Sequence, residues 1–247
     1  MSDTIFPILA IDAGNTRVKW AFHDGHAYVR TGVIETGGTA GIAGALPREL
    51  EARGAIASNV AGAEVGEILV RACGERGLEL RTIRSQAEQL GVTNSYREPG
   101  QLGSDRWAAL IAAHRVGPGH KLVVNAGTAL TIDALTADGR FLGGLIVPGP
   151  ALMRRSLDRG TAGLRLTEGD FAEFPASTAE AITTGSIQAC AGAVERMRDV
   201  MAGRDATPSQ IVLSGGGARE IAGHLPIAAT IRENLVIDGL LLIARAT

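Results

Sequence analysis

The sequence Ile8-Leu9-Ala10-Ile11-Asp12-Ala13-Gly14-Asn15-Thr16 is the part of the chain from which its architecture can be predicted. Residues 8–11 are apolar, as in a buried strand, and residues 12–16 are small and polar, which is typical of a tight turn. Residues 18–22 then predict a returning strand that ends at Asp24-Gly25. Together they predict a β-hairpin with a polar tip.

The same pattern recurs in the second half of the chain. Residues 122–124 lead into Asn125-Ala126-Gly127-Thr128-Ala129, and residues 130–135 return before a turn at Asp138-Gly139. Asp12 aligns with Asn125 and Gly14 with Gly127, both at an offset of 113 residues. A repeat with a constant offset indicates a duplicated unit. We therefore predict two lobes, residues 1–117 and 118–247.

The rest of each half alternates between helical and strand patterns. Third strands are expected at about 29–34 and 141–147. Helices at about 41–53 and 64–76, with strands at 55–57 and 78–83, would complete the first half. A helix at 178–201, a strand at 211–213 and a helix from near Asn234 would complete the second. This is an α/β plan, βββαβαβα, present twice.

The composition excludes several classes of protein. Of 247 residues, 45% are hydrophobic and 20% are charged, as in soluble globular proteins. The net charge of −2 argues against a nucleic-acid partner. Cys73 and Cys190 lie far apart in apolar stretches, which favours reduced thiols over a disulfide. Residues 1–4 lack a basic leader and no apolar run has membrane-spanning length, so we expect a cytoplasmic protein with no membrane partner.

Both hairpin tips are candidates for binding phosphate. Successive backbone N–H groups in a small-residue turn can bind an anion, and a carboxylate such as Asp12 can position hydrated magnesium. The alternative is that Asp-x-Gly-Asn is only a favourable turn sequence. The second tip, Gly127-Thr128-Ala129, favours the phosphate interpretation, because two loops can hold one nucleotide.

A third glycine cluster, Ser214-Gly215-Gly216-Gly217, follows the strand at 211–213. It could hold adenosine by close backbone approach, or it could be a plain connection. It lacks the full Gly-x-Gly-x-x-Gly dinucleotide fingerprint, which disfavours a nicotinamide enzyme.

The fourth motif, Gly103-Ser104-Asp105-Arg106-Trp107, begins a helix expected at about 108–115. In the structural interpretation Ser104 or Asp105 only caps that helix. In the functional one Asp105 is a general base that accepts a hydroxyl proton, and Arg106 holds a substrate carboxylate or the transferred phosphoryl group. The two interpretations are compatible.

These motifs, together with Gly143-Gly144-Leu145-Ile146-Val147-Pro148-Gly149, resemble type III pantothenate kinases, also called Bvg accessory factor homologues, of the actin-like ATPase superfamily. The resemblance spans almost the whole chain. It implies two duplicated actin-like (ribonuclease H-like) βββαβαβα lobes around an ATP cleft. It also implies ATP-dependent phosphorylation of pantothenate to 4′-phosphopantothenate, the first step of coenzyme A biosynthesis.

The resemblance implies specific site residues. The ATP-binding residues would be Asp12, Ala13, Gly14, Asn15, Thr16, Arg17, Val18, Lys19 and Thr128. The pantothenate-binding residues would be Tyr96, Gly103, Ser104, Asp105, Arg106 and Thr178, with Asp105 as the catalytic proton acceptor. Tyr96 could instead be a packing aromatic, and Thr178 could instead cap its helix.

The resemblance also implies Mg²⁺ with the ATP, an activating monovalent cation (K⁺ or NH₄⁺) and a homodimer. The family usually has aspartate where this chain has Asn125, and a neutral amide should bind the cation more weakly. We therefore assign no metal ligand in the chain. Two rival functions remain: a kinase of the same fold acting on another small alcohol or carboxylate, and an ATP-binding regulator without turnover.

Overall fold

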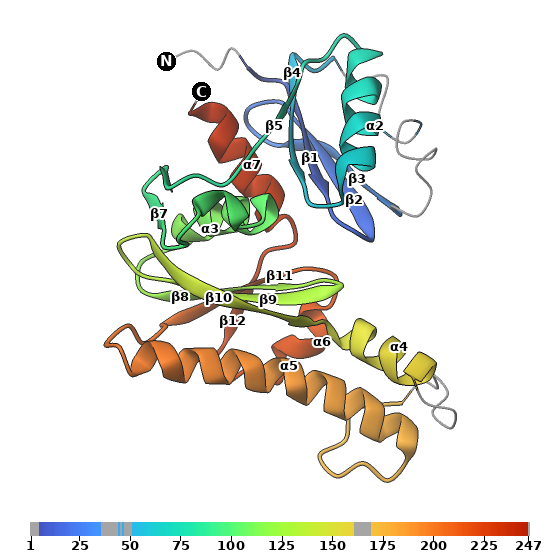
Figure 1. The fold of residues 1–247 in the computed structure, drawn as a ribbon, viewed down its shortest axis with the longest axis vertical. Helices are drawn as coiled ribbons and strands as arrows, with labels where there is room; N and C mark the ends of the chain where they lie inside the picture. Colours follow the sequence, from blue (N-terminus) through green and yellow to red (C-terminus); the bar gives the residue numbers. More distant parts are fainter. Residues whose placement is uncertain (1–4, 36–43, 45, 47–50, 161–168, 247) are drawn as a thin grey trace. The chain divides into compact units, whose positions relative to one another are not determined.

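The structure, a computed structural model, describes residues 5–35, 44, 46, 51–160 and 169–246. The chain forms two compact units (Figure 1): unit 1 comprises Met1–Ala112 and Leu235–Thr247, and unit 2 comprises Ala113–Asn234. The helix predicted at 41–53 lies largely outside the described residues. Within the described ranges, no helix is long and apolar enough to cross a membrane.

Unit 1 is built on a sheet with the strand order β3-β2-β1-β4-β5. Strand β1 is antiparallel to β2 and parallel to β4, and β4 is parallel to β5. Its elements are β1 Ile8–Ala13, β2 Arg17–His23, β3 Tyr28–Glu35, β4 Gly54–Asn59, α2 Ala63–Gly74, β5 Leu80–Thr82, β6 Glu88–Gln89, β7 Val92–Asn94, the 3₁₀ turn η1 Pro99–Gln101, α3 Ser104–His114 and α7 Leu235–Arg245.

The strands of unit 2 repeat this topology in the order β12-β11-β8-β9-β10, which is part of a seven-stranded sheet. Strand β8 is antiparallel to β9 and parallel to β11, and β11 is parallel to β12. Its elements are β8 Lys121–Ala126, β9 Ala129–Leu135, β10 Arg140–Pro148, α4 Pro150–Gly160, α5 Thr178–Ala202, β11 Gln210–Ser214, α6 Ala218–Ala222 and β12 Ala229–Ile231.

The duplication extends to individual residues. Asp12 on β1 faces Ser58 on β4 in the parallel register, and Asn125 on β8 faces Ser214 on β11. The two sheets therefore share strand order, direction and the position of the polar residue near the end of the central strand. The predicted α/β fold with two duplicated lobes is confirmed.

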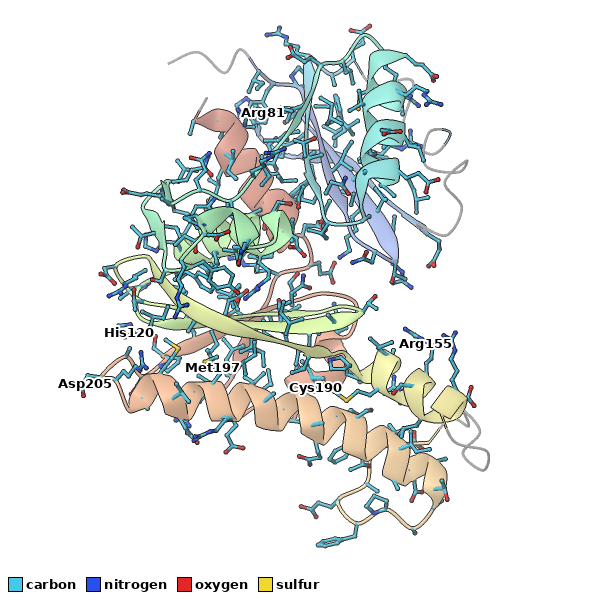
Figure 2. All side chains as sticks on the ribbon, viewed as in Figure 1. Arg81, His120, Arg155, Cys190, Met197 and Asp205 are labelled. Carbon is cyan, nitrogen blue, oxygen red and sulfur yellow. The ribbon has the colours of Figure 1, made fainter. Side chains whose placement is uncertain are left out.

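In each unit, the apolar face of a helix packs against the sheet. In unit 1, Val65, Leu69 and Cys73 of α2 pack against apolar residues of β1, β2 and β4. In unit 2, α5 packs along the sheet, and Cys190 and Met197 lie on its sheet-facing side (Figure 2). Burial raises the pKa of both the Cys73 and the Cys190 thiols to about 11, so neither cysteine is a ready nucleophile at neutral pH.

The C-terminal helix does not follow the division predicted at residue 117. Helix α7 packs against β1 and β4 of unit 1, although it follows the last strand of unit 2 in sequence (Figure 1). Its face buries Leu235, Leu240 and Ile243, so it needs an apolar surface to cover. Sequence order alone placed it with the second lobe.

Candidate active site

The first predicted phosphate loop is the turn between β1 and β2. The Gly14 N–H donates to the Arg17 carbonyl at 3.0 Å and closes the turn. Asn15 and Thr16 are exposed at the tip, while Asp12 and Lys19 are half-buried on adjacent strands and face each other in the register. The tip is thus a short polar loop held on two core strands.

Three of the predicted ATP-binding residues have side chains that are either buried or engaged in an ion pair. Ala13 and Val18 are fully buried in the core of unit 1, so they could contact a nucleotide only through their backbone. The exposed Arg17 is paired with Glu35, with 3.1 Å between Nε and Oε1. The exposed side chains at this tip are those of Asn15, Thr16 and Arg17, and those of Asp12 and Lys19 are half-buried.

The second tip has the same construction in unit 2. The Gly127 N–H donates to the Ala129 carbonyl at 3.0 Å, and Thr128 is exposed. The Gly149 N–H donates to the Thr128 carbonyl at 2.9 Å. A Cβ on Gly149 would lie 2.2 Å from the Gly127 carbonyl oxygen, so only glycine allows this approach. The Pro148-Gly149 segment therefore packs directly against the backbone of the second tip.

The third glycine cluster also lies against the second tip. Gly215 has a φ of +96°, and a Cβ there would lie 2.4 Å from the Ala126 carbonyl oxygen and 2.6 Å from Asn125 Oδ1. The Gly217 N–H donates to that Ala126 carbonyl at 2.9 Å. Close backbone approach to the end of β8 explains these glycines, and adenosine binding here stays a prediction.

The start of α3 brings Asp105 close to Asp12. The Trp107 N–H donates to the Gly103 carbonyl at 3.0 Å, so Gly103 precedes the first helical turn and neither Ser104 nor Asp105 occupies the cap position. Asp105 Oδ1 accepts the Arg106 N–H at 2.8 Å. Asp105 therefore satisfies one free N–H group of the first turn without being the cap.

The carboxyl groups of Asp12 and Asp105 both have raised pKa values. The pKa of Asp12 is raised to about 7, first by burial and then by the charge of Asp105, while the charge of Lys19 opposes the shift. Burial also raises the pKa of Asp105, against the Arg106 N–H hydrogen bond and the Arg106 charge. A raised pKa brings a carboxylate closer to the range in which it acts as a base near neutral pH.

Arg106 and Tyr96 form the next part of the site. Arg106 is only 5% exposed, and its Nη1 donates to the Tyr96 hydroxyl at 3.1 Å. The guanidinium carbon lies 5.9 Å from the centroid of the Tyr96 ring. The Tyr96 N–H donates to Asn94 Oδ1 at 3.0 Å, which fixes the backbone on which the ring stands. Tyr96 is thus more than a packing aromatic, because its hydroxyl orients the arginine.

Several residues that support this motif were not predicted. Ser58 Oγ lies 2.8 Å from Ser104 Oγ, and Ser85 Oγ donates to the Leu102 carbonyl at 2.7 Å. The Trp107 indole N–H donates to Gln89 Oε1 at 2.9 Å and links α3 to the β6–β7 hairpin. One signal was available for Ser58: serine stands at the end of the corresponding strand in both repeats, as Ser58 and Ser214.

Thr178 is the first residue of α5 and is exposed, but it does not cap the helix. Ser177 is the cap, and its Oγ accepts the Glu180 N–H at 3.2 Å. Glu180 Oε2 in turn accepts the Ala176 N–H at 2.7 Å. With Ser177 as the cap, the Thr178 hydroxyl has no capping role. The capping alternative for Thr178 is therefore wrong.

The acidic pair fits a hard divalent cation bound together with a nucleotide. Magnesium in phosphate-transfer sites is usually held by one or two carboxylates and by phosphate oxygens, with water completing the shell. Asp12 and Asp105 repel each other, and a cation beside Asp12 would relieve that repulsion. Among the residues that the structure describes, no group of three or more His, Cys, Asp or Glu side chains is arranged to hold a metal.

Comparison with protein families identifies relatives over most of the chain. A family model described as type III pantothenate kinase matches residues 8–200. The type III pantothenate kinase of Nitrosospira multiformis is 42% identical over 240 residues, which cover 97% of this chain and 92% of that protein. That of Chromobacterium violaceum is 43% identical over 237 residues, which cover 96% and 98%.

Solved structures share the fold at lower sequence identity. A conserved Baf family protein from Campylobacter jejuni superposes with a TM-score of 0.63 at 20% identity, covering 96% of this chain and 98% of that one. A ROK family glucokinase from Streptomyces griseus, solved with glucose and AMPPNP, gives 0.56 at 11% identity, covering 97% and 99%. These likenesses show the duplicated actin-like fold.

Proposed function

The chain belongs to the type III pantothenate kinase family, and we propose that it phosphorylates pantothenate through the acidic pair Asp12 and Asp105. The reaction is ATP plus pantothenate giving 4′-phosphopantothenate plus ADP, the first step of coenzyme A biosynthesis. The observation that carries the site assignment is that Ser104, the residue before Asp105 at the start of α3, lies 2.8 Å through its Oγ from Ser58 Oγ, and Ser58 pairs with Asp12 in the parallel register.

We assign the phosphates of ATP to the backbone N–H groups and side chains of residues 12–19. The family resemblance adds Thr128 as a further ATP-binding residue. Thr16, Asn15 and Lys19 supply donors, and Asp12 supplies a carboxylate for the hydrated magnesium that accompanies ATP. Magnesium neutralises phosphate charge in such reactions. Ala13 and Val18 would contribute only backbone groups.

We assign pantothenate binding to Tyr96 and to the segment Gly103–Arg106, and the family resemblance adds Thr178. Asp105 accepts the proton of the primary hydroxyl as that oxygen attacks the γ-phosphorus, and the bond from phosphorus to the bridging oxygen of ADP breaks. Arg106, held by the Tyr96 hydroxyl, binds the pantothenate carboxylate or the transferred phosphoryl group. Phosphoryl transfer depends mainly on positioning and charge stabilisation, so the loops should contribute more than the base.

The monovalent cation requirement should be weak in this protein. Asn125 stands where relatives usually carry aspartate, and its amide oxygen has no formal charge with which to bind potassium. We expect Asn125→Asp to increase the activation of turnover by K⁺, measured as the ratio of rates in potassium and sodium buffers. An unchanged ratio would place the cation site elsewhere.

We also propose that the protein works as a homodimer in the cytoplasm. The buried, weakly acidic thiols of Cys73 and Cys190 suit a reducing compartment. The dimer is inferred from the family resemblance and places the pantothenate site close to the subunit contact. Light scattering should give about twice the 25.5 kDa chain mass.

The deciding experiment measures ADP release from ATP·Mg²⁺ with pantothenate, with glucose, with acetate and without an acceptor. Mass spectrometry should identify 4′-phosphopantothenate only in the first reaction. Turnover with a sugar or carboxylate but not with pantothenate would support a different kinase. ATP binding without ADP release under any condition would support a regulator, and either result would overturn the proposal.

A further inference from the structure

Ser58 carries a buried hydroxyl next to the acidic pair. It lies near the carboxyl end of β4, is 0% exposed and faces Asp12 in the parallel register. Its Oγ is 2.8 Å from the Oγ of Ser104, which is 8% exposed at the start of α3. One hydrogen bond thus connects the strand beside Asp12 to the residue before Asp105.

The surroundings of Ser58 do not require a hydroxyl for packing. The preceding residues of β4, Ala55, Ile56 and Ala57, are all buried apolar side chains, so alanine at position 58 would suit the strand equally well. A buried hydroxyl is tolerated only where it has a hydrogen-bond partner, because desolvating it without one is costly. The Ser58 hydroxyl is thus explained by its bond to Ser104.

The end of β4 contacts both sides of the proposed site. The Val60 N–H donates to the Ala13 carbonyl at 2.9 Å, which joins this segment to the end of β1. A Cβ on Gly103 would lie 3.8 Å from Val60 Cγ1 and 2.6 Å from Asp105 Oδ1. Gly103 therefore lies close to Val60, which follows β4, and the Ser58–Ser104 pair is a second contact between this segment and the first turn of α3.

We propose that Ser58 is a positioning residue for phosphoryl transfer: through Ser104 it holds Asp105 at a fixed place relative to Asp12. This inference rests on the proposed function. Asp105 directly follows Ser104, so a rotation of this turn moves its carboxyl oxygens. Misplacing a reacting group by about 1 Å can lower a rate by about 10²-fold.

The test compares Ser58→Ala with Ser186→Ala. Ser186 is another buried serine, 5% exposed on α5, whose Oγ donates to the Thr183 carbonyl at 2.8 Å and accepts from Arg154 Nη1 at 3.2 Å. We expect Ser58→Ala to lower kcat by about 10-fold to 10²-fold while the KM for ATP changes less than about twofold. Ser186→Ala should keep the wild-type kcat. Ser58→Cys, which is somewhat larger than serine and hydrogen-bonds only weakly, should behave like Ser58→Ala and serves if the alanine variant does not fold.

A double-mutant cycle tests whether Ser58 affects kcat through Ser104. If Ser58 acts through Ser104, Ser58→Ala should have no further effect on kcat in a Ser104→Ala background. The positioning role would be overturned if kcat were unchanged in both Ser58 variants. It would also be overturned if Ser58→Ala lowered kcat by the same factor in the Ser104→Ala background as in the wild type. A wild-type protein that makes no 4′-phosphopantothenate would instead overturn the proposed function, and this inference with it.

Discussion

At the scale of single residues, the site is defined by two carboxyl groups that should not both ionise freely. Asp12 has a pKa of about 7, raised first by burial and then by the charge of Asp105, while Lys19 opposes the shift. At neutral pH without a bound cation, part of the protein would carry a proton on Asp12. Repulsion between the two carboxylates therefore raises the free energy of the empty site, and binding of a cation–nucleotide complex lowers it.

The raised pKa of Asp12 predicts a specific link between pH and stability. Its folded value of about 7 lies above the ordinary value of 3.8, so its contribution to stability is present below about pH 4 and is lost as pH rises through about 7. We expect Asp12→Asn to remove that pH dependence and to melt at or above the wild-type temperature at pH 8. Thermal unfolding at pH 5 and pH 8 checks this.

The same variant should fail in catalysis, because the amide cannot position magnesium as the carboxylate does. ATP turnover measured beside the melting curves separates the two effects. A variant that is less stable than wild type at pH 8, or one with normal turnover, contradicts the assignment of Asp12.

The general-base role of Asp105 predicts a kinetic loss without unfolding. In Asp105→Asn the amide oxygen can still accept the Arg106 N–H, which Asp105 accepts at 2.8 Å, so the first turn of α3 should survive. The amide cannot take the hydroxyl proton, so kcat should fall by about 10²–10⁴-fold while the KM for ATP changes little. Steady-state kinetics and a melting curve measure both quantities.

A matched control is Asp138→Asn, which changes an exposed carboxylate in the turn between β9 and β10. Its kcat should stay at the wild-type value. Near-normal turnover in Asp105→Asn would reduce Asp105 to a structural role at the start of α3.

At the scale of elements, α3 is positioned by a close crossing with α7. A Cβ on Gly239 would lie 2.0 Å from the Ala108 carbonyl oxygen and 2.9 Å from the Ala108 Cα. The obstacle is backbone, so a larger residue can be accommodated only by moving a helix. Because α3 begins with the Gly103–Arg106 motif, this contact bears on the site as well as on stability.

We expect Gly239→Ala to destabilise the protein by about 1–3 kcal/mol, the usual cost of overpacking a core. The control is Gly192→Ala on α5, where a Cβ would meet nothing within 4 Å. Alanine has the better helix propensity, so this variant should be neutral or more stable by up to about 1 kcal/mol. Equal denaturant midpoints for the two variants would rule out the close helix contact.

At the scale of the whole molecule, the chain returns to its first unit at its end. Arg245 Nη2 donates to the Gly25 carbonyl at 2.6 Å, and its guanidinium carbon lies 5.2 Å from the Phe6 ring centroid. The Tyr28 hydroxyl donates to Asp238. Unit 1 therefore needs residues from both ends of the sequence.

This arrangement predicts that removing residues 235–247 will damage unit 1 selectively. Strands β1 and β4 would lose the helix that covers them, whereas β8, β9 and β11 keep their own core residues from α5 and α6. Hydrogen exchange should show lost protection in β1 and β4 and retained protection in β8 and β11. Removing only residues 246–247 is the control and should leave both units protected. Uniform loss in the longer truncation would contradict the division into units.

Much of this fold follows from short-range patterns. The alternation of apolar and small polar residues predicts both hairpins and both tips, because strands and tight turns depend on neighbouring residues. The constant offset between Asp12 and Asn125 predicts the duplication that the two sheets display. The Gly103–Arg106 motif likewise predicts a helix without any knowledge of packing, although α3 begins at Ser104 and not near residue 108.

Contacts between distant segments were decided only by the tertiary structure. Ser58 and Ser104 are 46 residues apart and meet because β4 lies beside β1 in a defined register. Helix α7 joins unit 1 because its apolar face covers β1 and β4. Local composition constrains the conformation of a few neighbouring residues. Which distant side chains come together depends on strand order and on packing across the whole unit.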